Sequence, residues 1–287
     1  MKTRKLLVAS ARIATLGLAG CTQAESDPIV IGSQAYYSNE IVAEAYALVL
    51  EEAGYTVERQ FSLGQRDVYV PALLAGEVDL FPEYTGNLLQ YFIPEAPETA
   101  EDDVYSALTK ALPAGLTALE MSPATDQDSY NVTANFAAQN NLVSIADLAS
   151  ITGLKLGGAP ELAERPYGPT GLLSFYGVTV EFEATGDTTV EALVAGLIDM
   201  ANVYSADPRI QQLGLVTLTD PSGLFLASNV VPIASDALDQ RARDLINAVS
   251  RAMSAQDLVA MNVRSVRDQL SANQIAREWL VSKGLLS

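Results

Sequence analysis

Two segments of the chain, 120 residues apart, repeat one another. ALLAGEVDLFPEYTGN at 72–87 returns as ALVAGLIDMANVYSADP at 192–208, and each copy carries a tyrosine, Tyr84 or Tyr204. The matched positions are Ala72, Leu73, Ala75, Gly76, Asp79 and Tyr84, which recur as Ala192, Leu193, Ala195, Gly196, Asp199 and Tyr204. A period this long exceeds that of a solenoid repeat, so it predicts two similar domains.

Each copy closes an alternating series of strands and helices. Apolar spacing predicts strand, helix, strand, helix and strand over residues 28–82, with the first helix ended by Gly54. Residues 154–204 repeat this order. Such alternation predicts an α/β fold in which each domain is a mostly parallel sheet flanked by helices.

The domains are expected to share the chain unequally. Residues 122–136 have a turn-rich composition and are expected to cross from one domain to the other. The tail from residue 235 has helical patterns and no strands of its own, so we expect it to pack back onto the first domain. We therefore expect residues 28–125 plus 231–287 in domain 1, and 126–230 in domain 2.

The N-terminal residues have the pattern of an export signal. A basic start, MKTRK, precedes an apolar stretch and then Leu-Ala-Gly-Cys, which resembles a bacterial lipobox ending at Cys21. We expect residues 1–20 to be a lipoprotein signal peptide, Cys21 the lipidation site and 21–27 a tether to a bacterial membrane. The alternative is a buried helix with a buried cysteine. No later run approaches the roughly 18 apolar residues of a membrane span.

The composition argues against several classes of function. A net charge of −18 disfavours a nucleic-acid partner. The chain has no histidine, one cysteine, and neither a G-x-S-x-G nor a G-x-G-x-x-G motif. We therefore expect no enzyme activity, no metal and no cofactor. The remaining catalytic alternative is a hydrolase that uses Asp79 and Glu83 as paired acids.

The two repeated tyrosines are the first candidates for a binding site. In open α/β sheets the ligand crevice lies beyond the carboxyl ends of the strands, and Tyr84 and Tyr204 are each expected a few residues past such an end. Tyrosine faces that converge in a cleft suit a quaternary ammonium, at roughly 0.5–2 kcal/mol per ring. Alternatively, each tyrosine packs against its own sheet. Tyr36, Tyr37 and Phe225 lie in further candidate rim loops.

Several motifs resemble one family of binding proteins. The motifs are PEYTGN at 82–87, DSY at 128–130, ELAER at 161–165, YSADPRI at 204–210 and the closing AREWLVSKGLL. Over residues 28–287 the chain resembles the substrate-binding lipoproteins of ABC importers for glycine betaine, choline, carnitine and related osmolytes. The resemblance implies a two-lobed, type II periplasmic-binding-protein fold, a tyrosine cage between the lobes, a permease partner and no catalysis.

The resemblance also assigns individual residues. Tyr84, Tyr130 and Tyr204 match cage tyrosines, and Asp128 matches an acidic residue near the trimethylammonium end of the ligand. Arg165 matches the arginine that grips the ligand carboxylate, with Glu161 beside it. The alternative for Glu161 and Arg165 is an exposed i,i+4 pair on a helix, worth a few tenths of a kcal/mol.

Three positions depart from the family pattern. Many members have a lysine where this chain has Gln34, and a threonine where it has Asn87. Ser228 aligns with a usual cage tyrosine, whose wall Phe225 would have to supply. These departures leave the preferred ligand open between glycine betaine and a choline-like alcohol, which needs no carboxylate grip. The same fold tuned to an amino acid or another amine, or used for chemosensing, is the further alternative.

Overall fold

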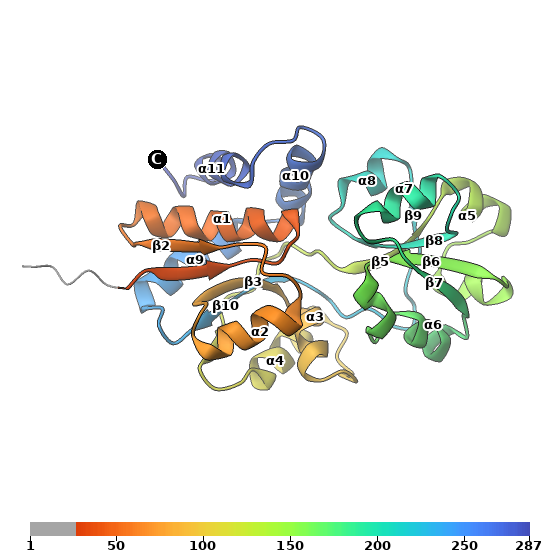
Figure 1. Cartoon of the computed structure of the whole chain (residues 1–287), viewed down its shortest axis with the longest axis horizontal. Coiled ribbons are helices and arrows are strands. Elements are labelled where there is room, and N and C mark those ends of the chain that lie inside the picture. Colours follow the sequence, from red (N-terminus) through yellow and green to blue (C-terminus); the bar gives the residue numbers. More distant parts are fainter. Residues whose placement is uncertain (1–26) are drawn as a thin grey trace, which may run out of the picture.

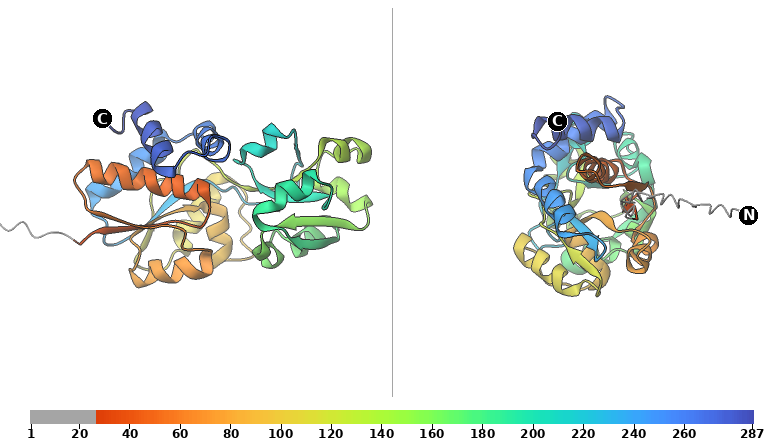
Figure 2. Two further views of the ribbon diagram at one scale, coloured as in Figure 1. Left: turned by 45° about the horizontal axis from the view of Figure 1, so that its top comes forward. Right: turned by 90° about the vertical axis from the view of Figure 1, so that its left-hand side faces the viewer.

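The computed structural model describes residues 27–287, which form two lobes side by side along the long axis of the molecule (Figures 1 and 2). The expected signal peptide, the lipidation site Cys21 and the tether up to residue 26 lie outside the described residues. Within the described part of the chain, no helix is long and apolar enough to cross a membrane.

Lobe 1 is built on a five-stranded sheet in the order β2-β1-β3-β10-β4. Its strands are β1 (Ile29–Gly32), β2 (Val57–Gln60), β3 (Leu80–Tyr84), β4 (Leu116–Ala118) and β10 (Val230–Ser235). Strand β1 pairs in parallel with β2 and β3, whereas β10 is antiparallel to both of its neighbours. The sheet is therefore mostly parallel, with one antiparallel strand, β10, which comes from a much later part of the chain than its neighbours.

Helices cover both faces of this sheet (Figure 1). They are α1 (Tyr37–Glu52), α2 (Arg66–Ala75), α3 (Thr85–Phe92), α4 (Glu101–Ala111), α9 (Gln240–Ala252), α10 (Ala255–Val266) and α11 (Ala272–Ser282). Helices α1 and α9 pack on one face, and α2, α3 and α4 on the other. Helices α10 and α11 pack against α1, which confirms that the helical tail returns to the first lobe.

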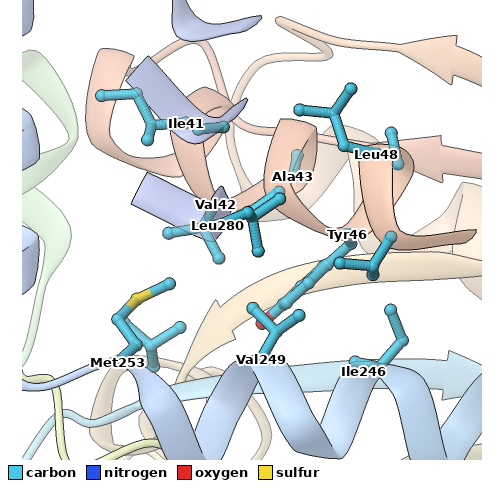
Figure 3. Packing of buried hydrophobic residues seen from close by; sticks show 14 of the residues in the cluster. Ile41, Val42, Ala43, Tyr46, Leu48, Ile246, Val249, Met253 and Leu280 are labelled. Atoms are coloured by element: carbon cyan, nitrogen blue, oxygen red, sulfur yellow. The ribbon is translucent and has the colours of Figure 1, made fainter. Parts of the chain in front are cut away.

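The α1 side holds the larger hydrophobic core of lobe 1. Ile41, Val42 and Tyr46 of α1 point toward Val249 of α9 and Leu280 of α11 (Figure 3). Every one of these side chains is at most 1 % exposed. Burial of each such aliphatic side chain stabilises the fold by about 1.5–3 kcal/mol, so the tail is an integral part of the lobe.

Lobe 2 repeats the plan with a sheet in the order β7-β6-β8-β5-β9. Its strands are β5 (Asp128–Val132), β6 (Leu154–Gly158), β7 (Val180–Ala184), β8 (Met200–Tyr204) and β9 (Val216–Thr217). The pairings correspond one to one with lobe 1, because β6 is parallel to β7 and β8 while β5 is antiparallel to β8 and β9. Strand β8 therefore occupies the position that β3 has in lobe 1.

The helices of lobe 2 are shorter. They are α5 (Ala134–Asn140), α6 (Pro169–Tyr176), α7 (Thr189–Val194) and α8 (Pro208–Gln212), with 3₁₀ turns at Ile145–Ser150, Pro160–Glu164 and Gly186–Thr188. Leu193 of α7 packs with Val203 on one face of the sheet, and Leu172 of α6 packs with Met200 on the other. The side chains of β8 thus alternate between two separate cores.

The sequence repeat has a structural cause at two of its matched positions. Gly76 and Gly196 end α2 and α7 with φ of 72° and 71°, in the left-handed region that glycine adopts without strain. Asp79 accepts a hydrogen bond from the Val30 backbone N–H at 2.9 Å, and Asp199 accepts one from the Lys155 N–H at 2.9 Å. Each aspartate joins two parallel strands, which makes its role structural.

Two expectations about local structure were wrong. Tyr84 and Tyr204 do not lie past their strands but are the last residues of β3 and β8. The expected crossover at 122–136 contains β5, an inner strand of the second sheet. Its polar residues satisfied the turn pattern, although Asn131 and its neighbours are buried. The domain boundaries at 125/126 and 230/231 remain a prediction.

Candidate ligand-binding site

A cluster of tyrosines lies where the two lobes face each other. Tyr36, just before α1, has its ring centroid 5.1 Å from that of Tyr204 at the end of β8. The Tyr36 ring also lies 4.8 Å from Tyr37. Tyr84 is 5 % exposed, and its hydroxyl has no hydrogen-bond partner among the described residues. Tyr84 is packed in the core of lobe 1 and lines neither of the inter-lobe spaces described below. Burial raises the pKa of its hydroxyl, and Asp126 and Tyr204 lie near enough to add to that rise. The ring from lobe 1 that packs against the repeated tyrosine of lobe 2 is that of Tyr36.

A buried carboxylate, Asp126, lies among these rings. It is 2 % exposed and accepts hydrogen bonds from the Tyr36 hydroxyl at 2.9 Å and from the Ala206 N–H at 3.0 Å. Burial raises the pKa of Asp126 to about 7, and the nearby carboxylates of Asp128 and Asp207 add to that effect. No described cation pairs with it. An acid held among aromatic faces without a counter-ion suits a cationic ligand.

The neighbouring acid, Asp128, belongs to β5 and lies directly across the ladder from Tyr204. Asn87 of α3 donates to its carboxylate at 2.8 Å and to the Tyr167 hydroxyl at 3.1 Å. Ser228 donates to the Asn87 side-chain oxygen. Burial raises the pKa of Asp128, and the hydrogen bond from Asn87 offsets part of that rise. Asn87 and Ser228, two of the departures from the family pattern, thus form a polar link between the lobes.

The residues predicted to bind the ligand carboxylate line a small chamber between the lobes. Arg165, Glu161, Asp128 and Tyr204 all line it, together with Arg66 from α2. Only about 10 Å³ is free inside this chamber, which is barely enough for one water molecule. A ligand can therefore enter only if the lobes separate or the side chains turn.

Glu161 and Arg165 do not form the i,i+4 helix pair that was the alternative. Residues 160–164 form a 3₁₀ turn begun by Pro160, and Arg165 is its C-cap. Because that turn has three residues per revolution, positions 161 and 165 do not stack over one another. The two side chains make no ion pair, and both line the chamber.

An open cleft leads to this chamber. It has a volume of about 630 Å³, within the range of small-molecule sites. Tyr36 and Tyr37 line it from lobe 1, and Arg209 from lobe 2. Tyr204 and Glu161 line both the cleft and the chamber, so the two spaces adjoin.

Three residues predicted for the site have mainly internal partners. Tyr130 is fully buried in the core of lobe 2, where its hydroxyl donates to the Tyr167 carbonyl oxygen. Phe225 packs between Tyr130 and Tyr167, at centroid distances of 5.2 and 5.7 Å, and lines a small space next to Asn87. Gln34 is buried in lobe 1 and donates to the Tyr69 hydroxyl at 3.2 Å.

The hydrolase pair is not formed. Glu83 accepts two hydrogen bonds from Arg66, at 2.9 and 2.7 Å, in a buried ion pair, and it also accepts from the Tyr69 hydroxyl. Asp79 accepts from Val30 and from the Ser235 hydroxyl. Both acids are therefore engaged in hydrogen bonds within lobe 1, and neither lines the chamber or the cleft.

Two charged residues of the site, Asp126 and Arg66, were missed from the sequence. Asp126 stands two positions before Asp128 in the segment interpreted as a crossover, and its partners Tyr36 and Ala206 are 90 and 80 residues away. Arg66 stands in a loop-to-helix junction with no motif. The Asp-Gln-Asp spacing at 126–128, which places two acids on one face of a strand, is the signal that could have found Asp126.

Two α/β lobes with a cleft between them are the architecture of type II substrate-binding proteins, a class that works outside the cytoplasm with ABC importers. Residues 27–282 match the family model described as the substrate-binding domain of ABC-type glycine betaine transport systems (OpuAC). The chain belongs to that family, and is thus a transporter substrate-binding protein, not an enzyme.

Known proteins support this assignment. The chain is 25 % identical over 280 residues to the glycine betaine-binding protein YehZ of Escherichia coli K12, across 90 % of this chain and 92 % of that protein. It is 24 % identical to the carnitine transport binding protein OpuCC of Listeria monocytogenes, across 96 % and 93 %. A crystal structure titled glycine betaine/carnitine/choline ABC transporter superposes with a TM-score of 0.75, at 20 % identity, across 90 % of this chain and 100 % of that one. The two-lobed type II fold is thereby confirmed.

Proposed function

We propose that this protein captures a quaternary ammonium osmolyte, such as glycine betaine or choline, in a tyrosine cage between its lobes and delivers it to an ABC permease. The observation that carries the proposal is the group formed by Tyr36, Tyr84 and Tyr204 around the buried, unpaired carboxylate of Asp126. Aromatic faces and one desolvated acid suit a cation that offers no hydrogen-bond donor.

The composition of the chamber supports a ligand with two ends. Tyr204 and Asp128 line the chamber and suit the cationic end, with Asp126 near Tyr204, whereas Arg165 suits a carboxylate. Relatives named for glycine betaine and for carnitine, which both carry a trimethylammonium and a carboxylate, are consistent with that division. Tyr130 and Phe225 then support the cage from within lobe 2, and Gln34 supports it from within lobe 1.

Choline is the second candidate ligand. Asn87 and Ser228 place an amide and a hydroxyl beside Asp128, where a choline hydroxyl would find hydrogen-bond partners. An amino-acid ligand, whose primary ammonium would pair with Asp126 or Asp128, is a further alternative. A role in chemosensing would keep the same site and change only the partner.

The rest of the cycle follows from the class of protein. We infer export by the signal peptide at 1–20 and a lipid anchor at Cys21, with the folded lobes outside the cytoplasm. Ligand binding closes the lobes, and the closed form is the one that the permease recognises. The described residues offer no group of three or more metal-binding side chains, and the proposal needs no metal.

Isothermal titration of the purified protein with glycine betaine and then with choline tests the proposal. Tight binding of glycine betaine supports a two-ended site with an intact carboxylate grip. Binding of choline alone supports the proposal with a retuned site. If neither ligand releases heat or raises the melting temperature, while an amino acid does, the quaternary-ammonium proposal is wrong.

A further inference from the structure

We propose that Arg66 is a specificity-determining residue that binds the anionic end of the ligand from lobe 1. The inference rests on the proposed function, because it assigns one end of the proposed ligand. It concerns a residue in none of the motifs that relate the chain to its family. Arg66 lines the inter-lobe chamber together with Asp128, Arg165 and Tyr204.

The side chain of Arg66 is buried, oriented and incompletely paired. Arg66 is 5 % exposed and is the first residue of α2. Its Nε and Nη2 atoms donate to Glu83 at 2.9 and 2.7 Å, whereas Nη1 donates to no described residue. One edge of the guanidinium is thus anchored, and the N–H groups of Nη1 remain available to a ligand.

Glu83 fixes Arg66 without fully neutralising it. The Glu83 carboxylate also accepts hydrogen bonds from the Tyr69 hydroxyl and from the Tyr84 N–H, the latter at 2.8 Å. Its negative charge is therefore shared among four donor contacts on three residues. Because the fork is already held in place, binding an anion costs little side-chain entropy. The N-terminus of α2, from which Arg66 projects, adds a partial positive charge.

A second arginine faces the same chamber from the other lobe. Arg66 and Arg165 each lower the pKa of the Tyr167 hydroxyl, although burial raises it overall. Both therefore lie near Tyr167 when the lobes are together. In the proposed closed form, a ligand carboxylate lies between guanidinium groups from opposite lobes, and the cationic end lies toward Asp128, which lines the same chamber. The ligand is thereby oriented end to end.

Arg66 also accounts for the neutral residue at position 34. Gln34 donates its amide to Tyr69, the tyrosine that donates to Glu83, and it does not line the chamber. Gln34 therefore contacts the Arg66–Glu83 ion pair only indirectly, through Tyr69. The positive charge at this end of the site comes instead from Arg66, on a different element of the same lobe.

The test removes the ion pair as a unit. Arg66→Met alone would leave Glu83 buried without a counter-ion and risks unfolding. The variant is therefore Arg66→Met with Glu83→Gln, which keeps the net charge of the chain. The matched control is Arg59→Met with Glu44→Gln, because that pair (2.8 Å) is also in lobe 1 and Glu44 is also buried, but neither residue lines the chamber or the cleft. Circular dichroism establishes that each variant folds.

Glycine betaine, choline and acetate are the three probes. For the Arg66 variant we expect glycine betaine affinity to fall about ten- to hundredfold, the value of a charge-assisted hydrogen bond. Choline affinity is expected to change by less than about threefold. Acetate, a carboxylate without an ammonium, is expected to raise the melting temperature of the wild type and the control more than that of the Arg66 variant.

The outcomes separate this inference from the proposed function. Equal losses for glycine betaine and choline, or no loss for either, would show that Arg66 is only structural and overturn the inference. If the wild type binds neither ligand, the proposed function fails and the acetate arm decides on Arg66 alone. In that case, a rise in melting temperature with acetate that is the same in the wild type, the control and the Arg66 variant overturns the inference. A rise confined to the wild type and the control supports it.

Discussion

At the scale of single residues, the site combines aromatic rings with a carboxylate that burial keeps from ionising easily. Tyr204 and Tyr36 are in contact, and Asp126 is bonded to Tyr36. These contacts join residues of the proposed cage to one another directly, so we expect the cage to be largely preorganised. What a ligand adds is a positive charge next to Asp126, which turns an unfavourable buried charge into a favourable pair.

Truncation of either repeated tyrosine tests the cage directly. We expect Tyr84→Ala and Tyr204→Ala each to weaken ligand binding about tenfold or more, because each removes a cation–π contact. Titration calorimetry against wild type measures the change. Tyr91→Ala is the control, since Tyr91 lies on α3 with its ring against Phe92 and lines none of the inter-lobe spaces described above. Wild-type affinity in both cage variants would refute the facing-tyrosine site.

Asp126 predicts a pH dependence of stability. Its pKa is about 7 in the fold and 3.8 ordinarily, so the folded state holds the proton more tightly than the unfolded state does. Between about pH 4 and 7 the free energy of unfolding therefore falls as pH rises, by roughly 4 kcal/mol for this group. Above pH 7 the contribution is constant. Tyr36, Asp128 and Asp207 are the titratable groups that face it.

Urea unfolding of wild type and Asp126→Asn from pH 4 to 8 measures this effect. Asparagine cannot ionise, and it keeps one acceptor oxygen for the two donors Tyr36 and Ala206, so the lost hydrogen bond adds an offset that does not depend on pH. The difference in unfolding free energy, wild type minus variant, is expected to decline from pH 4 to about pH 7 and to be constant from there to pH 8. A difference that stays constant from pH 4 to 8 would show that Asp126 titrates normally.

At the scale of elements, the internal repeat allowed much of the fold to be predicted. Matched glycines and aspartates recur because each lobe needs the same helix end and the same strand-to-strand link, at Gly76 and Asp79 or at Gly196 and Asp199. Local patterns of this kind are visible in sequence because their causes lie within a few residues or in an equivalent copy.

The parts that could not be predicted depend on distant partners. Strand β5 is polar because Asp128 bonds to Asn87 of α3 and Asn131 bonds to Thr217 of β9, so its sequence has no apolar alternation to reveal it. The ion pair of Arg66 with Glu83 joins α2 to β3 only after the sheet has formed. Family resemblance supplied Asp128 and Arg165, whereas Asp126 and Arg66 required the three-dimensional structure.

The repeated aspartates predict a measurable difference between elements. Asp199→Ala removes the acceptor for one backbone N–H and is expected to lower the free energy of unfolding by about 1–2 kcal/mol. Asp79→Ala removes acceptors for both Val30 and Ser235, and is expected to cost more, about 2–3 kcal/mol. Chemical denaturation measures both. Glu77→Ala, exposed and without a side-chain hydrogen bond, is the control, and midpoints equal to that control would contradict the structural role.

At the scale of the whole molecule, the two lobes are held together by few polar contacts. Asn87 bonds across to Asp128 and Tyr167, Tyr36 donates to Asp126, and the Asn262 side chain of α10 donates to the Ala206 carbonyl oxygen at 3.0 Å. Apolar packing also joins the lobes, because Ala206 lies in the core of lobe 1 and α8 packs against α10. We expect the polar bonds at the cleft to contribute to the balance between open and closed forms, which a ligand would shift by its differential affinity for the two forms.

Asn87 is the residue whose removal should shift that balance most. Its amide donates to Asp128 and Tyr167, and its oxygen accepts from Ser228. Asn87→Ala therefore removes a donor from the buried Asp128 carboxylate. Water can replace that donor only if the lobes separate. The loss of a hydrogen bond to a charged group, about 1.5–3 kcal/mol, corresponds to a tenfold or larger shift toward the open form. Small-angle scattering without ligand should then give a larger radius of gyration than wild type.

Gln90→Ala, one turn further along α3 and without a hydrogen bond from its side chain, should leave the radius unchanged. Saturating ligand should restore compactness to Asn87→Ala, because the ligand supplies contacts to both lobes that the variant lacks. A variant as compact as wild type before any ligand is added would mean that lobe packing, not this polar bridge, holds the molecule closed.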